Sequence, residues 1–273
     1  MKIETIGIIG LGNLGQALYQ ALPGPLLLHD RSPKPFPLAS AEEVLEQCSL
    51  VFLALPDDQI EAFVRDHQWG KKQGKQGVVH TSGALSLDAL EPARRAGVLV
   101  GSFHPLQAFR KKANKKSFEG ITVGVEAESP LFEALESIAL SLGARPRRLE
   151  ASQKVPYHLA ASILSNFTVT LFERASSLIG TAGFSSEEAR EMLLPLLEGT
   201  LENLRHPQAL TGPIARGDER TVRKHLDCLR ATPEDHRLYC MLAERTLALA
   251  ELAPETRERM NHIFKEEALC ERS

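Results

Sequence analysis

A glycine-rich turn directly after the first apolar run constrains this chain more than any other feature of its sequence. The run covers residues 3–9, and the turn at residues 10–15 reads GLGNLG, which has the spacing GxGxxG and opens a helical pattern over residues 13–22. In a strand–turn–helix unit, the first glycine allows a tight turn, the second lets the backbone approach a phosphate, and the third lets helix and strand pack closely. The motif therefore predicts a parallel sheet whose first helix begins at a phosphate-binding turn.

Short apolar runs alternate with helical patterns over the first half of the chain, which is typical of a parallel sheet. The runs are continuous, as strands covered on both faces require. They lie at residues 3–9, 25–29, 49–55, 77–81, 98–103 and 120–126, and we expect a last strand near residues 145–149. After Ala151 only helical patterns follow, the first of them over residues 156–179. We expect an α/β fold, with a doubly wound, mostly parallel Rossmann sheet in a domain of residues 1–150 and an all-α domain of residues 151–273.

The composition argues against several classes of partner. Of the 273 residues 43% are hydrophobic and 25% are charged, and the net charge is −3, so neither nucleic acid nor an anionic membrane is an expected partner. The four cysteines include no CxxC pair and so give no sign of a metal site. No signal peptide precedes the first run, and no run reaches membrane-spanning length. We expect a cytoplasmic protein that binds a small molecule and no metal.

The end of the second predicted strand carries conflicting signals about the ligand. Asp30 lies 20 residues after Gly10, where an acidic side chain can accept hydrogen bonds from both ribose hydroxyls of NAD. Arg31 and Ser32 follow it and would instead bind a 2′-phosphate. We expect NADP, with NAD as the alternative.

The third predicted strand ends in Leu55-Pro56-Asp57, which lies at the edge of the sheet that would face the nicotinamide. A plain turn explains these residues nearly as well. The predicted cofactor-binding residues are Gly10, Leu11, Gly12, Asn13, Leu14, Gly15, Asp30, Arg31, Ser32, Leu55, Pro56 and Ser82.

Two further strands end in residues that can do chemistry. Ser82 and Gly83 could offer a hydroxyl and an open backbone amide to a substrate carbonyl or carboxylate. His104 could donate a proton, because the ordinary pKa of histidine suits acid–base catalysis near neutral pH. Alternatively, His104 could bond a backbone carbonyl and fix its loop.

A polar stripe runs along the first predicted helix of the second domain. His158, Ser162 and Asn166 are spaced at i, i+4 and i+8, so they share one face of an otherwise apolar helix. Because buried polar groups need partners, the stripe faces either another polar helix or a ligand in a cleft. Arg216, in an irregular segment further on, could bind a substrate carboxylate, or pair with Asp218 or Glu219.

Together these segments resemble an uncharacterised bacterial family, in which a Rossmann-like domain of the deazaflavin-dependent NADP oxidoreductase type precedes an all-helical domain of unknown function. The matching motifs are GLGNLG at 10–15, LALPDD at 53–58, HTSGAL at 80–85, SFHPLQAF at 102–109, YHLAASILSNF at 157–167, LLPLLEGTLENL at 193–204 and ALTGPIARGD at 209–218. The wider superfamily that the chain resembles includes 6-phosphogluconate dehydrogenase, 3-hydroxyisobutyrate dehydrogenase, pyrroline-5-carboxylate reductase and ketopantoate reductase. The resemblance implies a homodimer built through the helical domains.

Ketopantoate reductases carry on the corresponding helix a catalytic lysine followed by asparagines four and eight residues later. In this chain His158 replaces the lysine, Ser162 replaces the first asparagine, and Asn166 matches the second. The resemblance therefore assigns Asn166 a role in catalysis and places His158 and Ser162 beside it.

We expect an NADP-dependent oxidoreductase that reduces a small carbonyl or imine compound bearing a carboxylate; a ketopantoate reductase-like reaction is one option. The predicted catalytic residues are His158, Asn166, Ser162 and His104, and the predicted substrate-binding residues are Ser82, Gly83 and Arg216. The alternative is a non-catalytic NAD(P)-binding sensor or partner protein.

Overall fold

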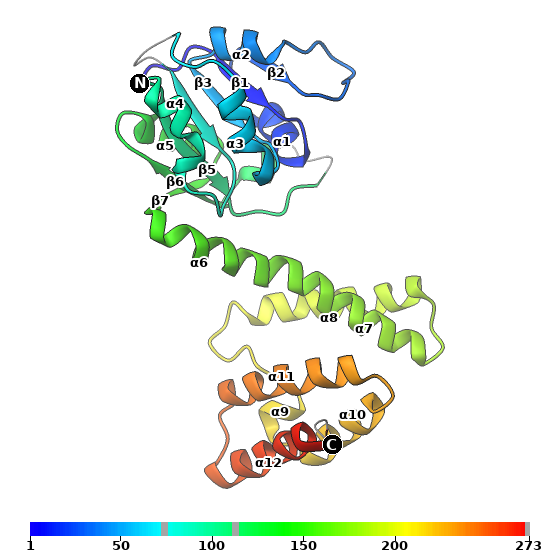
Figure 1. Cartoon of the computed structure of the whole chain (residues 1–273). Helices are drawn as coiled ribbons and strands as arrows, with labels where there is room; N and C mark the ends of the chain where they lie inside the picture. The colour runs from blue at the N-terminus through cyan, green and yellow to red at the C-terminus, as the bar shows by residue number, and fades with distance from the viewer. Residues whose placement is uncertain (72–75, 111–114, 271–273) are drawn as a thin grey trace. The chain divides into compact units, whose positions relative to one another are not determined.

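The computed structural model describes residues 1–71, 76–110 and 115–270 and divides the chain into two compact units, Met1–Thr168 and Val169–Ser273 (Figure 1). The first unit contains a seven-stranded sheet and the second is helical. Each unit is described by itself below. The predicted domain boundary near residue 150 stays a prediction, since the first helix after the sheet belongs by its contacts to the first unit.

The sheet has the strand order β2-β1-β3-β4-β5-β6-β7. Its strands are β1 (Ile6–Ile9), β2 (Leu26–His29), β3 (Leu50–Leu53), β4 (Gly77–His80), β5 (Leu99–Pro105), β6 (Thr122–Ala127) and β7 (Arg145–Arg148). Neighbouring strands are parallel except β5 and β6, which are antiparallel. The predicted mostly parallel sheet is therefore confirmed.

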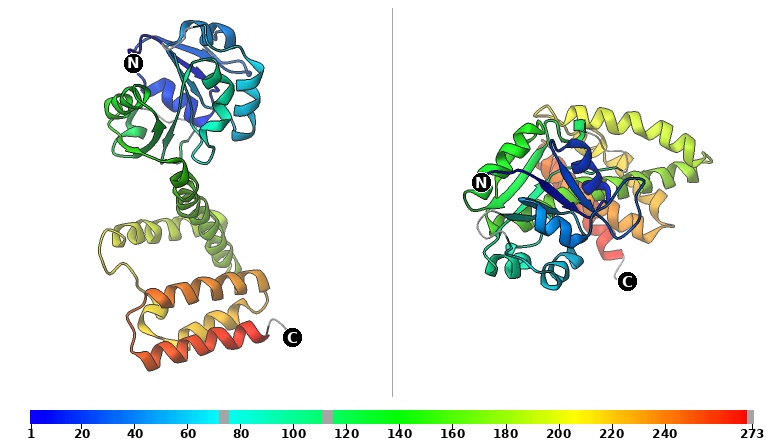
Figure 2. Two further views of the ribbon diagram at one scale, coloured as in Figure 1. Left: turned by 60° about the vertical axis from the view of Figure 1, so that its left-hand side comes forward. Right: turned by 90° about the horizontal axis from the view of Figure 1, so that it is seen from above.

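Helices cover both faces of the sheet, as a doubly wound fold requires (Figures 1 and 2). The helices are α1 (Asn13–Ala21), α2 (Ala41–Gln47), α3 (Asp57–Asp66), α4 (Glu91–Arg95) and α5 (Leu131–Ser141), with short 3₁₀ turns at Leu87–Leu90 and Lys115–Phe118. Successive strand residues enter different cores: Ile8 packs in the cluster with α1 and α5, and Ile9 packs in the cluster with α2, α3 and α4. Because successive side chains of a strand point to opposite faces, both faces of the sheet are buried.

The chain leaves the last strand and at once forms a long helical segment. α6 (Ala151–Ser162) is followed by a five-residue π-helix, Ile163–Phe167, and then by α7 (Thr168–Thr181). The prediction of one uninterrupted helix over residues 156–179 is therefore wrong in two respects: the helix begins at Ala151, and a π turn interrupts it. A capping box explains the earlier start, because Glu150 and Gln153 each accept a hydrogen bond from the other's backbone amide.

The second unit has helices and no strand in its described residues. Its helices are most of α7, α8 (Ser186–Asn203), α9 (Pro213–Arg216), α10 (Glu219–Leu229), α11 (Pro233–Leu249) and α12 (Pro254–Cys270). A small apolar core joins α10, α11 and α12; it contains Val222, Leu226, Ala243, Leu247, Met260, Ile263 and Phe264. Within the described parts of the chain, no helix has both the length and the apolar character that crossing a membrane demands.

Candidate active site and cofactor site

The strand order reverses at β1, which has β2 on one side and β3 on the other. In open α/β sheets ligands bind beyond the carboxyl ends of the strands at such a reversal. Gly10 follows β1 there with a φ of +92°, and a Cβ placed on it would lie 2.4 Å from the carbonyl oxygen of Ala54, which follows β3. The two strand ends therefore approach each other more closely than any other residue at position 10 would allow.

The other two glycines of the motif have different surroundings. A Cβ on Gly15 would lie 1.9 Å from the carbonyl oxygen of Gly10, so only glycine lets α1 pack this closely on β1. A Cβ on Gly12 would meet no described atom within 4 Å. Gly12 is also the N-cap of α1, and no described side chain caps that end of the helix. The start of α1 therefore has no side-chain cap and has open space over Gly12, as an anion site at a helix N-terminus requires.

A hollow of about 530 Å³ lies beside this turn, at the carboxyl ends of β1, β2 and β3. Eight of the predicted cofactor residues line it: Gly10, Leu11, Gly12, Asp30, Arg31, Ser32, Leu55 and Pro56. Four do not line it: Asn13, Leu14 and Gly15 belong to the first turn of α1, and Ser82 follows β4. The sequence reading missed the face of α3 that forms the other wall, with Gln59, Ala62 and Phe63. Their spacing of three and four residues on a helix was the available signal.

Asp30 is engaged with the protein itself. One carboxylate oxygen accepts the amide of Leu11 at 2.6 Å, and the other accepts the amide of Ser32 at 2.7 Å and lies 3.5 Å from Nζ of Lys34. Burial opposes ionisation, but the two amide hydrogen bonds and the charge of Lys34 outweigh it and lower the pKa of Asp30. The carboxylate thus fixes the turn. Arg31 is exposed beside it and donates to Oε1 of Gln59 at 2.6 Å.

A second hollow of the same unit, of about 550 Å³, lies where β5 ends and α6 continues. All four predicted catalytic residues line it: His104, His158, Ser162 and Asn166. Leu106, Ala160, Ala161 and Leu164 supply apolar surface between them. The spacing of the polar stripe therefore brought together residues that share one pocket, although the π turn lies between Ser162 and the end of the stripe.

His104 has one ring nitrogen engaged and the other pointed toward the pocket. Nδ1 lies 2.9 Å from the carbonyl oxygen of Thr81, so Nδ1 carries the hydrogen and Nε2 of the neutral ring is an acceptor. Burial lowers the pKa of His104, and the nearby charges of His158 and Lys154 lower it further, while the hydrogen bond to Thr81 opposes them. At neutral pH His104 is therefore a hydrogen-bond acceptor and not an acid.

His158 lies beside His104, with the ring centroids 5.8 Å apart and the planes at 66°. Both rings lie over Gly83: a Cβ placed on this glycine would be 2.7 Å from Nε2 of His104 and 2.7 Å from Cδ2 of His158. The predicted residue Gly83 thus makes room for both imidazoles.

Ser82 was predicted to bind both cofactor and substrate, but its hydroxyl already has partners. It donates to Oδ2 of Asp57 at 2.7 Å and accepts the amides of Ala84 and Leu85. The side chain is buried and fixes the turn after β4. A substrate would have to displace Asp57 in order to receive this hydrogen.

Lys154 is the residue near the site that the sequence reading missed. Its side chain is 2% exposed, and Nζ lies 3.0 Å from Oε2 of Glu126 and 3.1 Å from Oγ of Ser102. The signal was present, since Lys154 lies four residues before His158 and extends the polar stripe by one turn. Its partners are distant in sequence, so the pattern alone gave no reason for a buried lysine.

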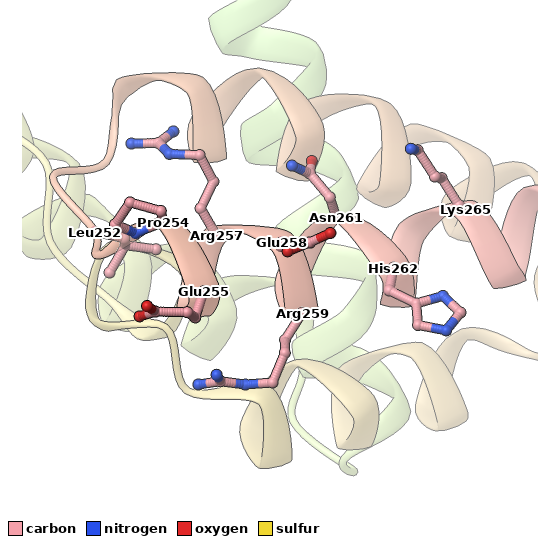
Figure 3. Close-up of a pocket in the computed structure, with 9 residues that line it drawn as sticks. All are labelled: Leu252, Pro254, Glu255, Arg257, Glu258, Arg259, Asn261, His262 and Lys265. Atoms are coloured by element: carbon pink, nitrogen blue, oxygen red, sulfur yellow. The ribbon is translucent and has the colours of Figure 1, made fainter.

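Arg216 lies in the second unit, on α9, where it is exposed and its charge helps to lower the pKa of Asp218, after the hydrogen bonds from Thr221. Its role toward a substrate stays a prediction. The second unit also has a hollow of about 850 Å³ along α12 (Figure 3). Its two arginines hold helices together: Arg257 donates to the last carbonyls of α11, and Arg259 pairs with Glu219. We assign it no function.

Two family models match the sequence. A Rossmann-like domain matches residues 28–105, and a domain of unknown function, DUF2520, matches residues 121–246. A search of curated proteins finds no match.

Solved structures share this fold over nearly the whole chain. A candidate NADP oxidoreductase from Bacteroides fragilis is 25% identical, with a TM-score of 0.69, over 90% of this chain and 98% of that one. A protein from Thermotoga maritima is 22% identical, with a TM-score of 0.66, over 94% and 99%. Pyrroline carboxylate reductase from Plasmodium falciparum, solved with NADP bound, is 13% identical, with a TM-score of 0.62, over 91% and 98%. The chain therefore matches a Rossmann-like domain over residues 28–105 and DUF2520 over residues 121–246.

Proposed function

We propose that this chain is an NADPH-dependent reductase, which transfers a hydride to the carbon of a C=O or C=N bond in a small compound bearing a carboxylate. The observation that carries the proposal is the pair of hollows in one folding unit, one beside the glycine turn and one beside His104 and His158. The resemblance to a candidate NADP oxidoreductase and to a reductase solved with NADP supports it.

The first hollow fits a dinucleotide by its shape and its donors. The uncapped amides at the start of α1 and the open space over Gly12 suit a pyrophosphate. Because Asp30 is already held by two amides and Lys34, while Arg31 is exposed beside it, the ribose end favours a 2′-phosphate over a free hydroxyl. When bound, the cofactor supplies the hydride.

The chain's own residues would orient the substrate and provide the proton. His158 is our choice of proton donor, since His104 is held neutral with its only N–H bonded to Thr81. Nε2 of His104 can accept a hydrogen bond from the substrate or from its product. Ser162 and Asn166, which line the same hollow, would hold the substrate oxygen or nitrogen. Arg216 is our proposed partner for the substrate carboxylate. A ketopantoate reductase-like reaction is one example of the proposed reaction class, the reduction of a small carbonyl or imine compound that bears a carboxylate.

The test is the oxidation of NADPH in the presence of a panel of 2-oxo acids and cyclic imines. We expect His158→Ala and Asn166→Ala to lower turnover at least about tenfold, because each removes a group that acts in the transition state. His206→Ala, which changes an exposed histidine of the second unit, is the matched control and should leave turnover unchanged.

Thermal melting of the same proteins separates binding from catalysis. NADPH should raise the melting temperature of all four proteins, and more than NADH does, because a ligand that binds only the folded state stabilises it. Normal turnover in both variants would contradict the assigned roles. Tight binding of NADPH without oxidation by any member of the panel would favour the non-catalytic sensor instead.

We further propose that the chain works as a homodimer paired through its long helices. Among their described residues the π-helix and α7 bury none, and α8 buries only Ala189. Large apolar side chains stand exposed on α6, the π-helix, α7 and α8: Leu159, Ile163, Leu164, Phe167, Val169, Leu171, Leu178, Met192, Leu194, Leu196 and Leu201. Apolar surface of this extent is typical of an interface, and a second copy of the chain is the partner that the family resemblance implies.

A further inference from the structure

Three polar residues form a row across the sheet next to the candidate active site. His80 of β4 pairs with Ser102 of β5, which in turn pairs with Glu126 of β6. Paired residues of neighbouring strands point to the same face of a sheet. His80 and Ser102 are 0% and 1% exposed, so this row places polar groups inside a buried part of the sheet, next to Leu53 and Ile9 of the same row.

Lys154 of α6 contacts two residues of this row, Ser102 and Glu126. Its ammonium bonds to Ser102 and Glu126 together, so a single side chain of α6 bridges the two antiparallel strands. Among the residues of α6, all of which the structure describes, only Lys154 is buried. A helix normally packs through apolar side chains, whereas the buried contact of α6 with the sheet is an ion pair.

The contact fixes the position of the next turn of α6 over the strand ends. Tyr157 lies against Gly124, where a Cβ would be 3.2 Å from its ring, and its hydroxyl points to the carbonyl oxygen of His104 at 3.5 Å. His158, one turn after Lys154, then lies beside His104. The anchor at Lys154 therefore determines where the two histidines meet.

The charge of Lys154 also acts on the histidines. Burial and the nearby Lys154 ammonium lower the pKa of His80 to about 3. Burial is also the main cause that lowers the pKa of His104; the charges of His158 and then of Lys154 add to it, and the hydrogen bond to Thr81 opposes it. Burial lowers the pKa of Lys154 itself, and Glu126 and Asp57 oppose this. The titratable groups facing the His104 ring come from three elements and are Asp57 of α3, His80 of β4, and Lys154, Tyr157 and His158 of α6.

We infer that Lys154 is a positioning residue of the active site: it fixes α6 on Ser102 and Glu126 and so places His158 beside the ring of His104, over Gly83. The effect of Lys154 on turnover rests on the proposed function. The placement of His158 and the protonation state of His104 are measurable without turnover.

The first measurement is a titration of the histidine rings by two-dimensional ¹H–¹⁵N NMR of the full-length protein. In the wild type we expect His104 to be neutral at pH 7, as the Nδ1–H tautomer, and to titrate below the ordinary pKa of histidine. Lys154→Met removes a positive charge, so the pKa of His104 should rise by about 0.5 or more. Ser102→Ala keeps the charge and should leave this pKa nearly unchanged.

Matched controls separate this effect from a general loss of charge or of folding. Lys2→Met removes the same charge from an ion pair with Glu4, on an exposed side chain before β1, and should not move the pKa of His104. If Lys154→Met does not fold, Lys154→Gln keeps a hydrogen-bonding group for Ser102 and should raise the pKa in the same direction. An unchanged His104 titration in both Lys154 variants would overturn the inference.

The second measurement is the pH dependence of kcat/KM for NADPH oxidation. Protonation of His104 removes its acceptor, so we expect kcat/KM to fall on the acid side, and this limb should lie at higher pH in Lys154→Met than in the wild type. A purely structural role would lower kcat/KM at all pH values without moving the limb, which would contradict the inference. A shifted NMR titration without turnover of any substrate would instead contradict the proposed function alone.

Discussion

At the scale of single residues, the candidate site depends on a position that has no side chain. Gly83 lies under the rings of both His104 and His158, and a methyl group there would force at least one of the two rings to move. The sequence singles out Gly83 as a source of a backbone amide, and the structure adds a steric reason for glycine. Alanine at position 83 would keep the backbone amide but would remove the room for the two rings, so this substitution distinguishes the two reasons.

Gly83→Ala therefore tests the steric role. The new Cβ would lie 2.7 Å from both rings, so at least one imidazole must move, and we expect kcat to fall at least about tenfold. The affinity for NADPH, measured by fluorescence titration, should change little. Gly180→Ala is the control, because a Cβ there meets no described atom within 4 Å. If Gly83→Ala turns over normally, the two histidines do not act in the geometry described above.

Among single residues, those with a local signal could be predicted and those with only distant partners could not. The stripe of His158, Ser162 and Asn166 follows from helical spacing, and the structure places all three at one hollow. The engagement of Ser82 with Asp57 joins two strand ends 25 residues apart, and no spacing rule gives that bond. The buried ion pair of Lys154 could not be predicted for the same reason, since its partner Ser102 lies 52 residues away in sequence.

At the scale of secondary structure, the strands were more predictable than the helices that follow them. Continuous apolar runs marked six of the seven strands, whereas β7 has the sequence RPRR. A pattern of apolar residues also does not reveal that β6 is antiparallel to β5. The π turn at Ile163–Phe167 was also missed. One extra residue in a turn leaves the apolar pattern almost unchanged, so a period of 3.6 fits both forms.

The N-terminus of α2 allows a prediction at this scale. Ser40 accepts the amide of Glu43, and Glu43 accepts the amide of Ser40 in return, which is a complete capping box. Ser40→Ala leaves the amide of Glu43 without its acceptor, and we expect the free energy of unfolding to fall by about 1 kcal/mol. Denaturation with urea measures this free energy of unfolding, and the m-value, which is its slope against urea concentration, should stay unchanged. Ser137→Ala, on the exposed surface of α5, should change stability by less than about 0.5 kcal/mol. Equal effects of the two variants would show that the box contributes nothing.

At the scale of the whole molecule, the two units differ in how they bury apolar surface. The first unit has a core on each face of its sheet, whereas in the second only α10, α11 and α12 share a core in the described residues. The sequence predicts the change from strands to helices. It does not predict that α7 and α8 lack a buried face within one chain, because an amphipathic helix looks the same whether its partner belongs to its own chain or to another.

The proposed homodimer gives the corresponding prediction. Light scattering should find a particle of twice the chain mass of 30.0 kDa. Leu196→Asp, at a position of α8 that is 67% exposed in the single chain, should yield monomers, since a carboxylate in an apolar interface is costly. Leu140→Asp, on α5 and 61% exposed, should leave the dimer intact. A wild-type monomer at micromolar concentration, or a dimer that tolerates Leu196→Asp, would argue against pairing through α8.

The crowding of two imidazoles over Gly83 also limits how relatives of this chain can diverge. A lineage in which either histidine is replaced by a smaller side chain loses the steric conflict at position 83. A residue larger than glycine can then be accepted at that position. In a lineage that keeps both rings, even alanine at position 83 would displace at least one of them. Across many descendants, variation at positions 83, 104 and 158 should therefore be correlated, and an ancestral change of chemistry should have begun at one of the rings.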